Sequence, residues 1–237
     1  GEDILAIILE QPACARFITR HLYNFFVADE PQVPAWPIEE PRDLDAIGVM
    51  EKAFVGSGFE IAPTLEVIFK SDFFKEAIYQ KVRSPAEVVA GTLRLTGDLN
   101  GPDPRWGMLT DEPGYMGQAL LDPPSVEGWH TGKEWIDGGT LLRRINFIAD
   151  HVGDVSYPGI QEIVKSLVSE GPTISPDNLV NGCLRLLGHY ELTEENHQAL
   201  LDQARQNGDL PTNNREFPQH VAKVLQMIVA TKEYLYA

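Results

Sequence analysis

The chain has 237 residues, of which 43% are hydrophobic, and its formal net charge is −16 because 35 Asp and Glu residues outnumber 19 Lys and Arg residues. A chain of this size buries about 70–75% of the surface that its unfolded state exposes, which excludes disorder as its main description. Nucleic-acid binding is disfavoured, since that affinity comes largely from Lys and Arg side chains at phosphates. Anionic membrane surfaces are disfavoured for the same reason.

Helical periodicity dominates the first part of the sequence. The first residues of the chain have a helical pattern, and Pro12 begins a helix that extends to residue 27. The apolar face expected for that helix consists of Cys14, Ile18, Leu22 and Phe25. Further helices are expected over residues 42–55, 62–69 and 71–79.

A strong helix start follows at Ser84, with Ser at the N-cap, Pro85 at the first helical position and Glu87 three residues after the cap. The composition then changes over residues 97–139, which contain nine of the twenty glycines, five prolines and three of the four tryptophans. One short helix is expected within this stretch, around residues 115–121. A loop this long in a compact domain is usually functional or held down by its own side chains, so we expect a site here.

Helical signals resume after this loop. They cover residues 141–152, 158–169, 176–187 and 193–206, and residues 221–229 have the clearest amphipathic pattern in the chain. No alternating strand pattern of useful length occurs. The sequence therefore predicts an all-α protein: an irregular multi-helix domain with a long loop, rich in Gly, Pro and Trp, packed on the helices. We expect a helical domain over residues 1–153 that carries the loop, and a C-terminal helical subdomain over residues 154–237 that packs on it.

Complete catalytic and metal-binding motifs are absent from the sequence. It has no His-Glu-x-x-His, no Gly-x-Ser-x-Gly, no Gly-x-Gly-x-x-Gly, no P-loop and no Cys-x-x-Cys. Residues 98–103 offer oxygen ligands around a glycine but lack the remaining ligands of an EF-hand, which favours a polar turn over a calcium site. The sequence thus predicts no metal and no cofactor, and it assigns no catalytic residue.

The two cysteines lie far apart in the sequence. Cys14 and Cys183 each have apolar neighbours at helical spacing, which favours core packing for both. One disulfide between them stays open as an alternative in an oxidising compartment. No apolar run approaches the roughly 20 residues of a transmembrane helix, and the first residues lack the basic start of a signal peptide.

Five side chains with binding chemistry lie close together in and after the long loop. They supply an amide, two indoles, a carboxylate and a guanidinium, which can line a sugar or peptide cleft because an indole face stacks on a sugar while polar groups fix its orientation. The predicted ligand-binding residues are Gln118, Trp129, Glu134, Trp135 and Arg144.

A purely structural interpretation of the same segment stays open. In it, Pro123, Pro124 and the tryptophans hold the loop onto the helical core. Arg144 would then pair with a loop carboxylate such as Glu127 or Asp137.

At these residues the sequence resembles a bacterial family catalogued as domain of unknown function 1800. The resemblance is dense over residues 1–150, and the end of the chain, 225–234, is similar to the usual family ending. Because family members are generally longer at the N-terminus, the chain is similar to their C-terminal part. The segments that carry the resemblance are residues 11–17, 22–26, 69–74, 82–88, Gly-Gln-x-Leu at 117–120, Pro-Pro-x-Val-x-Gly-Trp at 123–129, and Trp135-Ile136.

The resemblance implies a helical fold and export, hence a periplasmic or extracellular location, often with a sulfatase-like protein encoded nearby as a companion. It implies no activity, because none is established for the family. The family usually has proline after the Gly-Trp pair, where this chain has His130, so the resemblance gives His130 no catalytic role. Gln118, Trp129, Trp135 and Arg144 fit the family pattern better.

The sequence favours a non-catalytic binding or scaffolding module of an exported bacterial protein, with a glycan or a protein as its partner. The lack of a complete catalytic constellation leans against an enzyme. Two alternatives stay open: a hydrolase that acts on glycans or other cell-surface polymers through carboxylate acid–base chemistry, and a structural subunit of a larger assembly.

Overall fold

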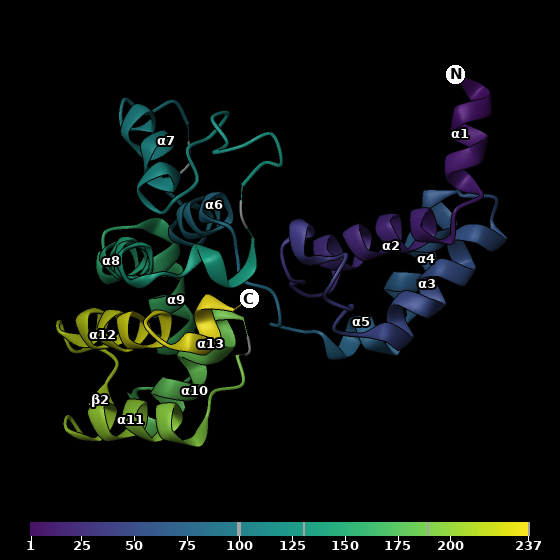
Figure 1. Ribbon diagram of the computed structural model, residues 1–237. Coiled ribbons are helices and arrows are strands. Elements are labelled where there is room, and N and C mark those ends of the chain that lie inside the picture. Colours follow the sequence, from purple (N-terminus) through teal and green to yellow (C-terminus); the bar gives the residue numbers. More distant parts are fainter. Residues whose placement is uncertain (99–100, 130, 189, 237) are drawn as a thin grey trace. The chain divides into compact units, whose positions relative to one another are not determined.

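The computed structural model describes residues 1–98, 101–129, 131–188 and 190–236 (Figure 1). The protein is all-α, as predicted, with one two-stranded sheet among the described residues. The chain forms two compact units. The N-terminal unit contains residues 1–82 with Thr131 and Gly132, and the C-terminal unit contains residues 83–129 and 133–236. No helix of the described ranges is long and apolar enough to span a membrane.

The N-terminal unit is built around α2, which packs on α3, and α3 in turn packs on α4 (Figure 1). Its core contains Tyr23, Val27, Ile47, Met50 and Ile68. All of α1 is exposed, including its isoleucines and leucines. The elements of this unit are α1 (Glu2–Leu9), α2 (Pro12–Phe26), η1 (Val33–Ala35), α3 (Leu44–Gly56), α4 (Ile61–Lys70) and α5 (Asp72–Glu76).

The buried face of α2 differs from the predicted one by about one residue. The structure buries Ala15, Thr19, Arg20 and Tyr23, whereas Phe25, predicted for the core, is 69% exposed. The reason is that Arg20 has its acceptors inside the unit, and a rotation that buried Phe25 would move this guanidinium away from them. A hydrophobic pattern alone does not contain this constraint.

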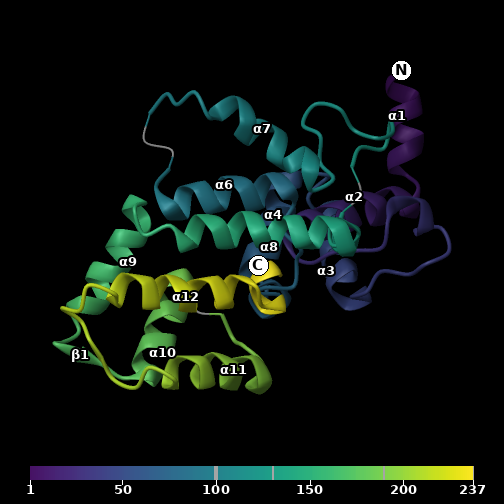
Figure 2. The same ribbon diagram turned by 90° about the vertical axis from the view of Figure 1, so that its left-hand side faces the viewer.

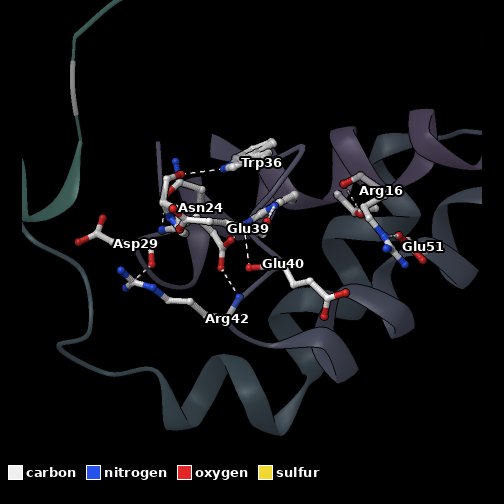
Figure 3. A network of polar contacts seen from close by, with 12 residues as sticks. Arg16, Asn24, Asp29, Trp36, Glu39, Glu40, Arg42 and Glu51 are labelled. Carbon is white, nitrogen blue, oxygen red and sulfur yellow. Dashed lines mark hydrogen bonds and ion pairs between the residues drawn. The ribbon is translucent and has the colours of Figure 1, made fainter. Parts of the chain in front are cut away.

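A buried ion pair joins α2 to the segment that follows it, and Figure 3 labels Glu39, Glu40 and Arg42 of that segment in the surrounding polar network. Arg20 and Glu30 are 2% and 3% exposed, and Arg20 Nε donates to Glu30 Oε2 at 2.6 Å. Arg20 Nη1 and Nη2 donate to the carbonyl oxygens of Glu39 and Glu40 at 2.8 and 3.1 Å. Glu30 Oε1 accepts the backbone N–H of Arg42 at 3.0 Å. The pair therefore fixes residues 30–42, which have little regular structure of their own.

Asp29 extends this network to the end of the unit. Its Oδ2 accepts the backbone N–H of Val82 at 2.8 Å, and its carbonyl oxygen accepts from Arg42 Nη1 at 2.7 Å. Lys81 Nζ lies 3.6 Å from Asp29 Oδ1. Gly132 has φ +64°, and a Cβ at this position would lie 3.1 Å from Asp29 Cβ and Cγ, so the close approach requires glycine.

The C-terminal unit stacks α7, α6, α8 and α12 in that order (Figure 2), and α10 and α11 pack on α12. Strands β1 and β2 are antiparallel, with Ile174 opposite Leu210. The predicted amphipathic segment 221–229 is the buried face of α12. The elements are α6 (Pro85–Thr96), α7 (Trp106–Tyr115), η2 (Gly132–Trp135), α8 (Gly138–Gly153), α9 (Pro158–Val168), β1 (Thr173–Ile174), α10 (Pro176–Leu187), α11 (Glu194–Arg205), β2 (Leu210–Pro211), α12 (Phe217–Val229) and α13 (Lys232–Leu235).

The helix in the long loop lies earlier than predicted. Residues 115–121 were expected to be helical, whereas α7 ends at Tyr115. Gly117 at φ +97° and Leu121 at φ +64° take the chain out of the helical region, and this stops the helix. The division of the chain into domains at residue 153 stays a prediction, while the compact units divide it after Val82.

Replacement of Glu30 by Ala is expected to lower the free energy of unfolding by about 3–5 kcal/mol, because it leaves the buried Arg20 guanidinium without its counter-ion. Urea denaturation followed by circular dichroism measures this change. The matched control is Glu51→Ala, which removes an ion pair with Arg16 that is partly exposed on both sides, and it should cost no more than about 1 kcal/mol. Equal effects of the two substitutions would contradict a structural role for the buried pair.

Candidate functional site

The first turn of α6 is the point where the long loop and α8 meet. The predicted capping box is present, with Ser84 Oγ accepting from the Glu87 backbone N–H and the Glu87 carboxylate accepting from the Ser84 backbone N–H. Gln118 Oε1, from the loop, accepts the backbone N–H of Ala86 at 2.9 Å. Arg144 Nη1, from α8, donates to the carbonyl oxygen of Arg83 at 2.7 Å. Two predicted site residues thus bind the same four-residue stretch, Arg83–Ala86.

Trp135 is part of the packing of this region. Its side chain is 6% exposed, and its carbonyl oxygen accepts from Thr140 Oγ1 at 2.9 Å. A Cβ at Gly117 would lie 3.7 Å from Thr140 Cγ2 and 4.0 Å from Trp135 Cε3, so the loop backbone next to Gln118 contacts this indole. A sugar stacks on an exposed aromatic face, which Trp135 does not offer. Its position agrees with the structural interpretation of this tryptophan.

Arg144 is fully buried and only partly hydrogen-bonded. Its exposed fraction is 0%, and its Nε and Nη2 have no acceptor among the residues that the structure describes. Burial and the nearby Arg83 charge lower the pKa of Arg144 to about 10, and Glu87 opposes this shift. The alternative pairing of Arg144 with Glu127 or Asp137 is not observed. Arg144 binds a backbone carbonyl instead, because Asp137 caps α8 and accepts from the N–H groups of its first turn.

Two further side chains of this unit carry buried nitrogen donors without an acceptor. Arg83 Nη2 donates to the carbonyl oxygen of Tyr234, and its guanidinium carbon lies 4.6 Å from the centre of the Tyr234 ring, but its Nε has no acceptor in the described part of the chain. Trp129 is half-buried, and its buried Nε1 also lacks one. Arginine and tryptophan nitrogens only donate hydrogen bonds, and buried donors without acceptors are rare in native proteins.

The predicted site residues therefore divide into three groups. Gln118 and Arg144 meet at the start of α6, and Trp135 packs beside the backbone that carries Gln118. Trp129 shares with Arg144 a buried donor without an acceptor. Glu134 lies exposed on η2, whereas a general acid at a glycan site is typically a carboxyl in an apolar pocket. His130 lies outside the described residues.

Other candidate reactive groups are occupied or inaccessible. Burial raises the pKa of the Cys183 thiol to about 12, which keeps it protonated at neutral pH, and both cysteines are free thiols. Asp98 and Asp103 each bind Arg105 at 2.6 Å, while Leu99 and Asn100 of the same turn lie outside the described residues. Within the described ranges, no group of three or more His, Cys, Asp or Glu side chains is placed to hold a metal ion.

A groove of about 280 Å³ lies between α7 and α8 and was not predicted from the sequence. Its lining includes the apolar side chains of Met108 and Phe147 and the bidentate pair of Arg143 with Glu112. His151 Nδ1 lies 2.7 Å from the carbonyl oxygen of Phe147, which makes Nδ1 the protonated nitrogen and leaves Nε2 as an acceptor in the neutral ring. The sequence contained no pattern that predicted this groove, because the residues that form α7 were expected to be irregular loop.

Fold and site together define an all-α protein in which an irregular aromatic loop and α8 converge on one helix start. Its family is shown by its sequence: the profile of the family described as "Protein of unknown function (DUF1800)" matches residues 1–236, and the chain belongs to this family. The match extends well beyond the densely similar residues 1–150. No curated protein and no solved structure matches the chain. The family description assigns no activity.

Replacement of Gln118 by Ala is expected to destabilise the protein by about 1–3 kcal/mol, because the Ala86 N–H would lose its acceptor. Thermal and urea denaturation measure the change. Gln118→Glu is the matched control: it keeps an acceptor at the positive end of α6 and should retain wild-type stability or exceed it. A Gln118→Ala variant as stable as wild type would show that the loop does not depend on this hydrogen bond.

Proposed function

We propose that the protein is a non-catalytic binding module of an exported bacterial protein, acting in the periplasm or outside the cell. The observation that carries the proposal is the set of four buried donor nitrogens on Arg83, Trp129 and Arg144 that have no acceptor in the described residues. A buried N–H without an acceptor is costly, and a ligand that supplies oxygen acceptors removes this cost on binding. Export is supported by the family resemblance alone.

The chemistry of these side chains favours binding over catalysis. Acid–base catalysis requires a group that accepts and releases a proton near neutral pH, whereas guanidinium and indole nitrogens do not exchange their protons in that way. The carboxylate that acts on Arg144, Glu87, is engaged in the capping box of α6. Donors held in fixed positions recognise hydroxyl, carbonyl or carboxylate oxygens, which glycans and peptides both provide.

Trp129 is the residue that we assign to ligand contact in the loop. It is half-buried, so part of its ring is accessible while its Nε1 is buried without an acceptor. An indole in this state offers a face for stacking and an N–H for a ligand oxygen. A protein ligand, for which the sulfatase-like companion implied by the resemblance is one candidate, would engage the same donors through its carbonyl groups.

Tryptophan fluorescence of the full chain, titrated with a panel of glycans and peptides, should identify a ligand through a saturable change in emission. Calorimetry then compares variants with that ligand. Trp129→Phe keeps a ring but removes the N–H, and it should weaken binding about tenfold or more. Trp106→Phe is the matched control in the same unit, since Trp106 is 43% exposed on α7, and it should bind as wild type does.

Two results would contradict the proposal. Equal affinity of wild type and Trp129→Phe would remove Trp129 from the site, and a lack of response to every ligand would remove the site itself. Release of product from a bound glycan, lost in Glu134→Gln, would replace the binding module by the glycan hydrolase.

A further inference from the structure

The free side of the Arg144 guanidinium is the side that recognises planar anions. Nε and Nη2 project their N–H groups in parallel from one edge, and these are the two nitrogens that lack an acceptor. The third nitrogen, Nη1, is occupied by the carbonyl oxygen of Arg83. A carboxylate or phosphate accepts two parallel N–H groups at once, which makes this edge the preferred contact of arginine with such groups.

The neighbouring residue shows the same edge in use. Arg143 Nε donates to Glu112 Oε2 at 3.0 Å, and Arg143 Nη2 donates to Glu112 Oε1 at 2.6 Å. Arg143 is exposed, whereas Arg144, one position later on α8, is fully buried. The exposed Arg143 thus has a carboxylate partner at its Nε and Nη2 edge, whereas the buried Arg144 has none. A charge-assisted hydrogen bond is strongest in a buried environment.

The local charge also favours an anion, although the whole chain is acidic. Arg144 donates to the backbone carbonyl oxygen of Arg83, and the positive charge of the Arg83 side chain contributes to lowering the pKa of Arg144. Glu87 is the acidic group that acts on Arg144, and its carboxylate accepts the Ser84 N–H at 2.7 Å. An anion bound at the free edge of Arg144 would reduce the unfavourable effect of the Arg83 charge. The net charge of −16 acts over a longer range and is screened by salt.

We infer that this protein binds an oxyanion, the carboxylate or phosphate group of its ligand, at the Nε and Nη2 edge of Arg144 beside Arg83. The inference rests on the proposed binding function, and it names the chemical class that the site recognises. A uronic acid or an acidic peptide carries such a carboxylate, and a phosphorylated glycan carries the phosphate. The buried Arg144 guanidinium would then select ligands that carry a carboxylate or phosphate group.

The test is the melting temperature of the full chain in acetate, phosphate or sulfate, with ionic strength held constant by sodium chloride. A specific site raises the melting temperature saturably, with equal increments for each tenfold rise in anion concentration above Kd. Arg144→Lys keeps the charge but lacks the parallel N–H groups, and its apparent Kd should rise about tenfold or more. Arg143→Lys is the matched control and should respond as wild type does, since its edge is taken by Glu112.

The Glu87→Gln variant tests whether the anion at Arg144 is an added ligand or the carboxylate of Glu87 itself. If the Glu87 carboxylate leaves the capping box and occupies the Arg144 edge, the anion response will appear only in Glu87→Gln, which would overturn the inference. The inference is supported if wild type and Glu87→Gln both respond. A stronger effect of acetate assigns the site to carboxylates, and a stronger effect of phosphate and sulfate assigns it to phosphate-like groups.

The measurement on wild type decides the matter even if Arg144→Lys does not fold. In a sample with ¹⁵N-labelled arginine, a buried Nε–H should shift saturably with the oxyanion but not with chloride. No oxyanion-specific shift would overturn the inference, and neutral ligands that still bind through Trp129 would leave the proposed function intact. An oxyanion response together with equal ligand affinity of wild type and Trp129→Phe would support the oxyanion site and would remove Trp129 from the ligand contact that the proposed function assigns to it.

Discussion

A guanidinium taken out of water needs an acceptor for each of its nitrogens, and each unit of this protein buries one such group. In the N-terminal unit, all three nitrogens of Arg20 donate to oxygens, one of them in the carboxylate of Glu30. In the C-terminal unit, Arg144 has one acceptor for three nitrogens. The need for acceptors is thus met for Arg20 in the N-terminal unit and is only partly met for Arg144 in the C-terminal unit. This contrast is the reason why we assign Arg20 a structural role and propose a binding role for Arg144.

The satisfied arginine determines how the N-terminal unit is organised. Because Glu30 also accepts the Arg42 N–H, one ion pair orders a segment of about a dozen residues whose only regular element is η1. Asp29 carries the network on to Val82. Hydrogen bonds to charged groups hold this segment in place, as helix packing does for the rest of the unit. They also explain why α2 buries Arg20 and leaves Phe25 exposed.

The unsatisfied arginine lies where three distant parts of the sequence converge. Residues 83–86, 118 and 144 meet in hydrogen bonds at the start of α6, and the positive end of that helix adds to the charge of the two arginines. The ordinary acceptors at this point are already used: Gln118 binds Ala86, Glu87 binds Ser84, and Asp137 caps α8. Membership in a family of unknown function gives this arrangement no assigned role, and its unpaired donors are the basis of the proposed oxyanion site.

Features that depend on neighbours within a few residues could be predicted from the amino-acid sequence. The Ser84 capping box, the Pro176 helix start and the buried face of α12 were predicted, because caps and helical periodicity are local. The sequence also pointed to Gln118 and Arg144 as residues of interest, but not to their contacts with Arg83–Ala86, which are 32 and 61 positions away. Which nitrogens of each guanidinium have an acceptor depends on the folded structure, because the acceptors come from distant chain segments that meet only when the whole unit packs.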